Sequence, residues 1–241
     1  MDFKLEVPTS LEYFASLVQS DTEFPLLEAA ICLAQDEYPE LDIQEVLGQV
    51  DQLVSRLKKR LPADAGAIHK LRLLNKFFFE EMGFAGNANN YYDPDNSYLH
   101  VMLRTRRGIP ISLALLWLEL AGQIGLDAHG VGFPGHFLVK VHLPYPHEGK
   151  VVIDPFNGHS LTKEDLMERL SPLYVESGLV RDGEISDELL KHYLRSATPR
   201  EIMTRMLRNL EEVYGSQSDI ERLDAVRKRL KVLLPSLDEA V

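Results

Sequence analysis

The chain of 241 residues contains a single cysteine, Cys32, and a single tryptophan. One cysteine excludes an intramolecular disulfide and any zinc site built from several thiolates. The first residues also lack the basic stretch followed by an apolar run that marks a signal peptide. These absences are typical of a reducing compartment, and we expect a cytoplasmic protein.

Positive charge is scarce as well. The chain has 26 Lys and Arg against 37 Asp and Glu, a net charge of -11. This balance provides no basic surface for a phosphate backbone and is repelled by an anionic membrane. The longest apolar stretch, Ile109 to Ala121, is too short to span a bilayer and contains Glu119. We therefore expect neither nucleic acid nor membrane as a partner.

The N-terminal third of the chain shows helical periodicity. A capping-box sequence lies at Thr9 and Glu12, and apolar residues recur at helical spacing over 43–61. A further helix is expected at about 63–82. We assign 1–85 to a helical N-terminal region.

The middle of the chain changes character twice. Turn-forming residues with two exposed-looking tyrosines, Tyr91 and Tyr92, occupy 86–96. A short helix at 98–106 and a helix at 111–123 follow, and the second is apolar nearly all round. A helix of that composition has to be central and buried.

Three strand-like segments come next, AHGVGF at 128–133, HFLVKVH at 136–142 and KVVID at 150–154. If the loop between the last two is centred near Pro146, Leu138 lies opposite Asp154. On that register His136 and Asp154 share a face as diagonal neighbours, so their side chains can meet.

The last part of the chain returns to helix. One short helix begins at 162–165, and segments 199–214 and 218–234 form a helical hairpin. The apolar face of the first hairpin helix has to be covered, either by the rest of the chain or by a partner. That face carries Met203, Met206, Leu207 and Leu210.

Four blocks occur in order: NSYLHVMLRTRRGIPISLALLWLELA, PGHFLVKV, VVIDPFNG and RMLRNLEEVY. In these blocks the chain resembles the bacterial transglutaminase-like proteins of the SirB type, whose core belongs to the transglutaminase-like, papain-like superfamily. The resemblance implies a mainly helical α+β fold, with a central buried helix packed on a small antiparallel sheet in 86–180. It also implies a tetratricopeptide-like helix pair in a helical tail at 181–241.

In active members of the superfamily, a cysteine at the start of the central helix attacks an acyl carbon, assisted by a histidine and an acid. The resemblance aligns Arg107-Gly108-Ile109 with the superfamily pattern Arg-Gly-x-Cys, so Pro110 falls on the nucleophile. His136 falls on the histidine and Asp154 on the acid. Two of the three catalytic positions therefore match.

Three interpretations of this site follow. Ser112 could replace the nucleophile, although two positions along a helix turn it by about 200° from the required direction. Alternatively, the fold is retained without activity, and His136 and Asp154 form a structural pair. In the third interpretation Cys32 is recruited, although a thiol on an apolar helix face is usually buried and inert.

A small basic cluster, Arg104, Arg106 and Arg107, precedes the central helix. It either pairs with acids such as Asp93 and Asp95 or clamps a carboxylate of a ligand. As candidate ligand-binding residues we take Arg104, Arg107, Tyr91 and Tyr92.

No cofactor is expected. The G-x-G-x-x-G sequence at 130–135 is followed by a strand pattern where nucleotide binding requires a helix, so its glycines are interpreted as turn residues. The other histidines do not have the spacing of a metal motif, so no metal is expected either.

The leading hypothesis is a non-catalytic module that binds a protein or peptide, with a regulatory role left open. The alternative is an amidase or peptidase that uses Ser112, His136 and Asp154. The sequence does not specify an oligomeric state.

Overall fold

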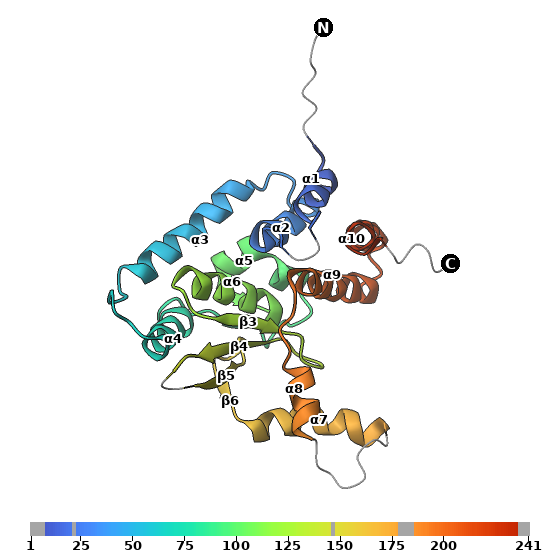
Figure 1. Cartoon of the computed structure of the whole chain (residues 1–241). Coiled ribbons are helices and arrows are strands. Elements are labelled where there is room, and N and C mark those ends of the chain that lie inside the picture. The colour runs from blue at the N-terminus through green and yellow to red at the C-terminus, as the bar shows by residue number, and fades with distance from the viewer. Residues whose placement is uncertain (1–7, 21–22, 146–147, 178–185, 236–241) are drawn as a thin grey trace.

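The computed structural model describes residues 8–20, 23–145, 148–177 and 186–235. Within these ranges helices surround a small antiparallel sheet (Figure 1), which confirms the mainly helical α+β class. None of the helices described here is both long and apolar enough to cross a membrane.

The N-terminal region is helical, as predicted. The capping box at its start is confirmed, because the Glu12 amide donates to Thr9 Oγ1 (3.2 Å) and the Thr9 amide to Glu12 Oε2 (2.8 Å). The helix expected at about 63–82 begins a few residues later and ends as a π-helix. The elements are α1 (Ser10–Leu17), α2 (Leu26–Cys32), the 3₁₀ turn η1 (Leu33–Asp36), α3 (Ile43–Lys58), α4 (Ala67–Asn75) and the π-helix η2 (Lys76–Glu81).

Helix α6 (Pro110–Gln123) is the centre of the molecule. It lies between the sheet and the helices α2, α3 and α5 (Figure 1), and most of its side chains are buried. Short elements lead into it and position its first turn. They are β1 (Ala85–Gly86), which pairs in parallel with β2 (Arg107–Gly108), the 3₁₀ turn η3 (Pro94–Ser97) and α5 (Leu99–Thr105).

The four-stranded sheet has the order β3-β4-β5-β6 and is antiparallel throughout. Val139 pairs with Ile153. Continuing this register by one residue places Leu138 opposite Asp154, which confirms the predicted pairing. The strands are β3 (Ala128–Val131), β4 (Leu138–Leu143), β5 (Gly149–Ile153) and β6 (Ser160–Leu161).

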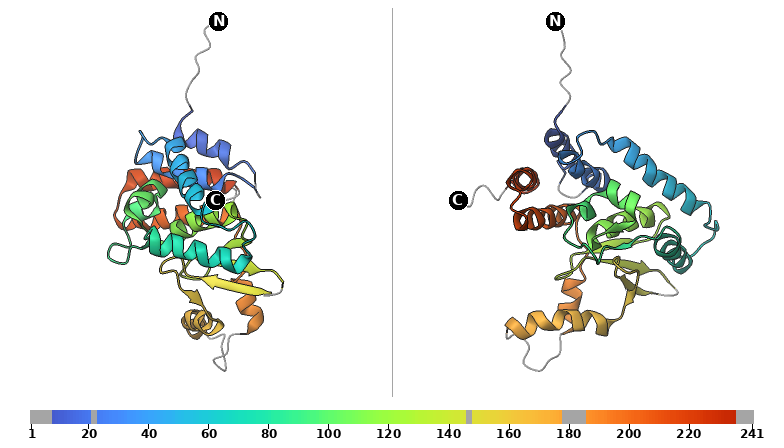
Figure 2. Two further views of the ribbon diagram at one scale, coloured as in Figure 1. Left: turned by 90° about the vertical axis from the view of Figure 1, so that its left-hand side faces the viewer. Right: turned by 180° about the vertical axis from the view of Figure 1, so that it is seen from behind.

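Both faces of the sheet are covered. Val139 and Val141 of β4 face the main core with α6, whereas Leu138 faces a second, smaller apolar cluster. That cluster is closed by α7 (Lys163–Ser177) and α8 (Asp187–Tyr193), on the side of the sheet away from α6 (Figures 1 and 2). The sequence analysis did not anticipate α8.

The C-terminal hairpin consists of α9 (Pro199–Ser216) and α10 (Ile220–Leu233), which pack against each other (Figure 2). The predicted apolar face of α9 is covered by the chain itself, because Met203 and Met206 are fully buried in the main core. This core draws residues from all three predicted regions, 1–85, 86–180 and 181–241. The boundaries between the regions stay predictions.

A buried ion pair joins α10 to the N-terminal helical region. The Arg229 side chain of α10 is almost fully buried, and its guanidinium donates to both carboxylate oxygens of Asp36 at 2.7 and 2.8 Å. The guanidinium also lies 5.1 Å from the ring centroid of Phe14 in α1. A bidentate pair of this kind fixes both the distance and the orientation between the guanidinium and the carboxylate.

Replacing Arg229 by Met should therefore destabilise the fold strongly. The change leaves the Asp36 carboxylate without its cation in a largely buried place, and we expect the free energy of unfolding in urea to fall by about 3 kcal/mol. Arg227→Met, on the same helix but in an exposed pair with Glu211, is the matched control and should cost less than about 1 kcal/mol. Equal losses in the two variants would contradict a structural role for the buried pair.

Candidate active site

His136 and Asp154 lie just beyond the paired ends of β4 and β5, where the register brings them together. His136 Nε2 is 2.7 Å from Asp154 Oδ1, so the predicted hydrogen bond is present. A tight turn places the histidine: its amide donates to the Phe133 carbonyl (3.1 Å), and Gly135 has φ of +66°. Glycine adopts that left-handed conformation at little cost.

Asp154 is 2% exposed and fully hydrogen-bonded. Oδ1 also accepts from the Phe156 amide (3.0 Å), and Oδ2 accepts from Arg169 Nη2 of α7 (2.9 Å). Burial by itself would raise the pKa of Asp154, but the bonds from His136, Phe156 and Arg169 outweigh it and lower the pKa below its ordinary value. A carboxylate that accepts a hydrogen bond at this place favours the imidazole tautomer with its proton on Nε2 and turns Nδ1 away from Asp154.

His136 lines a cavity of about 270 Å³ at the N-terminus of α6, and Asp154 lies behind it. Pro110, the first residue of α6, and His136 both line it. A second wall comes from one face of α9, where the lining residues recur at helical spacing. These are Arg205, Asn209, Glu212 and Val213.

The predicted hydrolase arrangement of Ser112, His136 and Asp154 is not formed. Ser112 is fully buried; its hydroxyl donates to the Asn96 carbonyl (2.7 Å) and accepts from the Ile109 amide (3.1 Å). The serine thus stabilises the first turn of α6, facing away from the cavity, as the helical geometry required.

Cys32 does not reach the cavity either. The thiol is fully buried under α10, where Arg229 Nη1 lies 3.7 Å from its Sγ. Burial raises the pKa of Cys32, outweighing the opposing effect of Arg229. The recruitment of Cys32 as a nucleophile is therefore wrong on both position and chemistry.

The basic cluster is also placed differently from the prediction. Neither Arg104 nor Arg107 lines the cavity, and Arg107 Nη1 donates to the Gly83 carbonyl (2.8 Å). The Asp95 carboxylate, a predicted partner of the cluster, instead accepts a hydrogen bond from the Tyr38 hydroxyl through Oδ1 (2.6 Å).

The cation at the cavity is instead Arg205, whose Nη1 donates to the Phe133 carbonyl (3.1 Å). Tyr91 and Tyr92 do line the cavity, with ring centroids 5.4 Å apart. Arg205 is not among the residues predicted from the sequence, because only the apolar face of α9 has a recognisable spacing.

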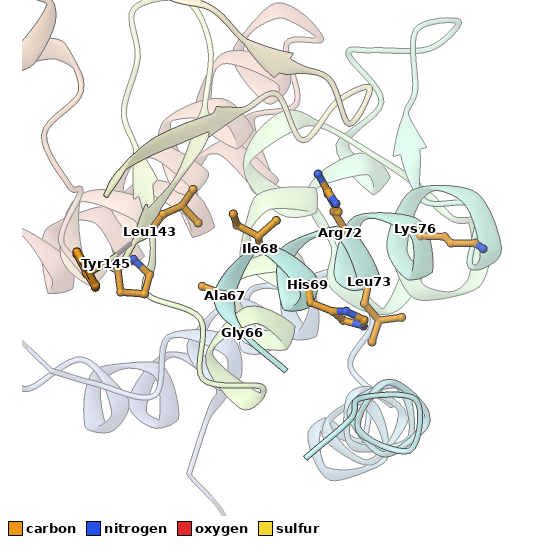
Figure 3. Close-up of a pocket in the computed structure, with 10 residues that line it drawn as sticks. Gly66, Ala67, Ile68, His69, Arg72, Leu73, Lys76, Leu143 and Tyr145 are labelled. Atoms are coloured by element: carbon orange, nitrogen blue, oxygen red, sulfur yellow. The ribbon is translucent and has the colours of Figure 1, made fainter. Parts of the chain in front are cut away.

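A wider groove of about 850 Å³ lies between α4 and the end of β4 (Figure 3). Its walls are largely apolar. Ile68 and Arg72 point toward the strands, whereas His69 and Leu73 lie on the other side of the helix (Figure 3). Because its polar groups diverge, this groove has less of the character of an active site than the cavity at His136.

A central helix whose first turn lines the same cavity as a His-Asp pair, beside an antiparallel sheet, defines a transglutaminase-like protein. The sequence model of the transglutaminase-like superfamily matches residues 44–208. The chain is 36% identical over 234 residues to a UPF0162 protein of Xylella fastidiosa, covering 96% of this chain and 80% of that protein. The chain therefore belongs to the transglutaminase-like superfamily and, within it, to the UPF0162 family.

Two further relatives are similar to parts of this chain. A UPF0162 protein of Pseudomonas aeruginosa is 31% identical over 209 residues, which cover 86% of this chain and 71% of that protein. Human F-box only protein 21 is 30% identical over 148 residues, covering 52% of this chain and 24% of that protein. No solved structure matches the chain.

The lowered pKa of Asp154 makes the free energy of unfolding depend on pH. Its pKa in the folded chain is lowered, so the unfolded chain, with a value near 3.9, takes up the proton first as the pH falls. The stability from this carboxylate is thus complete above about pH 5 and is lost as the pH falls through the folded pKa.

We expect Asp154→Asn to lower the free energy of unfolding at pH 7 and to flatten its decline between about pH 5 and pH 3. Urea unfolding at a series of pH values measures both effects. Asp51→Asn, on the exposed side of α3, is the control and should follow the unmodified chain. An unchanged slope in Asp154→Asn would show that the carboxylate is not stabilised by folding.

Proposed function

We propose that this chain is a cytoplasmic, SirB-type transglutaminase-like protein that binds a protein or peptide segment at the His136 cavity without catalysing acyl transfer. The observation that carries the proposal is Pro110. It occupies the start of α6, where the resemblance places the nucleophile, and it has no atom that could attack a carbonyl carbon. The histidine and the acid remain, so the cleft keeps its shape and hydrogen-bonding groups.

The cavity has the side chains that recognise peptides. Tyr91 and Tyr92 are 41% and 64% exposed, and tyrosine provides a large contact surface with a polar end. Arg205 has five N–H donors, which suit a carboxylate at a peptide end or on an acidic side chain. Burial lowers the pKa of Arg205, against a smaller raising effect from Tyr91. A partly desolvated guanidinium forms stronger charge-assisted bonds than one in water.

In this proposal the helical tail forms one wall of the cavity. We propose that α9 and α10 are a tetratricopeptide-like pair whose apolar face packs on the core while an adjacent side of α9 faces the ligand. Arg205, Asn209 and Glu212 lie on that side. The apolar face itself is not offered to a partner, because the chain covers it.

Pro110→Cys tests whether residue 110 stands at the nucleophile position. The N-terminus of α6 and the His136 imidazole should lower the pKa of the introduced thiol, from about 8.5 toward 7 or below. We expect iodoacetamide to alkylate it at pH 7 at least about tenfold faster than in the double variant Pro110→Cys, His136→Ala.

Mass spectrometry of the alkylated peptides separates this thiol from Cys32, which serves as the slow internal reference because it is buried. Equal rates with and without His136 would overturn the assignment of Pro110 to that position.

Binding is tested by selecting displayed random peptides on the full chain and measuring their affinities in solution. Tyr92→Ala removes an aromatic side chain that lines the cavity, and we expect it to weaken the selected peptides by about tenfold or more. Tyr145→Ala is the matched control, because Tyr145 is 82% exposed and lies outside the cavity. Selected peptides that Tyr92→Ala does not weaken would contradict the proposal, and so would peptides weakened only by Tyr145→Ala, since Tyr145 lines the groove beside α4, or a selection that yields no binder.

A further inference from the structure

Two histidines that are far apart in the sequence meet an aspartate on one face of the sheet. Asp127 immediately precedes β3 and His129 lies within it, so their side chains project from the same face. Ala128 pairs with Val141, and the His142 amide donates to the Asp127 carbonyl (2.8 Å). His142 of β4 is therefore directly opposite Asp127, and all three side chains lie together.

The side chains converge as well as the backbone. Asp127 Oδ1 is 2.7 Å from His129 Nε2, and Oδ2 is 3.1 Å from His142 Nδ1. The three side chains each offer a ligand atom within 4.8 Å of the other two. In a tetrahedral site with bonds of about 2.1 Å, ligand atoms lie about 3.4 Å apart. Small side-chain rotations therefore bring these atoms to coordination distance.

In His142 the ring nitrogen available to a metal ion is Nδ1, which faces the aspartate. The other nitrogen, Nε2, is covered by protein and has no hydrogen-bond partner. The side chains of His129 and His142 are 40% and 35% exposed, so an ion can reach them from solvent.

We propose that Asp127, His129 and His142 form a binding site for a divalent transition-metal ion of the zinc type. Two imidazoles and one carboxylate are the ligands preferred by Zn²⁺, Ni²⁺ and Cu²⁺, whereas Ca²⁺ and Mg²⁺ prefer oxygen ligands. Three protein ligands leave a fourth position for water or for a group from a partner molecule. The sequence pattern does not reveal the site, because antiparallel pairing rather than helical spacing brings His142 to the other two.

Titration calorimetry with Zn²⁺ on the full chain, prepared without a polyhistidine tag, tests the proposal. We expect one ion per chain, no comparable binding of Mg²⁺, and at least about tenfold weaker binding in His129→Asn, in His142→Asn and in Asp127→Asn. His69→Asn, which replaces an exposed histidine of α4, is the matched control and should bind as the unmodified chain does.

The visible absorption of Co²⁺ provides a second readout, because bands of a low-symmetry, nitrogen-ligated ion should appear in the unmodified chain and be lost in the same three variants. Asp127→Asn changes an exposed side chain and keeps its shape, so it remains informative if a histidine variant does not fold. Absence of Zn²⁺ binding, or binding that none of the three changes weakens, would overturn the site.

Discussion

Helix α6 is apolar on nearly every side, and such a helix is stable only when protein covers it all round. This requirement organises the molecule. The sheet covers one side, the N-terminal helices another, and α9 packs nearby in the same core. At the edge of this core, the Arg229–Asp36 pair joins α10 to the 3₁₀ turn η1.

The same arrangement creates the candidate site. The first turn of α6 is fixed from inside by the Ser112 hydroxyl, and a Cβ at Gly108 would lie only 2.7 Å from that oxygen. From the other side, Asp154 is held by Arg169 and in turn holds His136. These bonds hold the first turn of α6 and the His136–Asp154 pair in place. Hydrogen-bonding groups that are already positioned lose less entropy on binding, which supports the proposed role in recognition.

Local patterns predicted much of this. Helical periodicity located α3, α6 and the α9–α10 hairpin, and the centre of the short loop between β4 and β5 predicted the register that joins His136 to Asp154. The register could be predicted because a short loop fixes which residues of the two strands lie opposite each other. The predicted placement of Arg104 and Arg107 at the cavity is not found, because their order along the chain does not specify which way each guanidinium points.

The sequence alone thus determined the buried helix and the His136–Asp154 pair, since each depends on neighbours close along the chain, while the resemblance implied the fold class. Only the tertiary structure decided that Arg169 supports Asp154 and that Arg205 lines the cavity. Only it brought α10 onto the N-terminal helices through Arg229. These contacts join helices whose apolar stripes can pack in several ways, and the choice among them is made by the shape of the whole core.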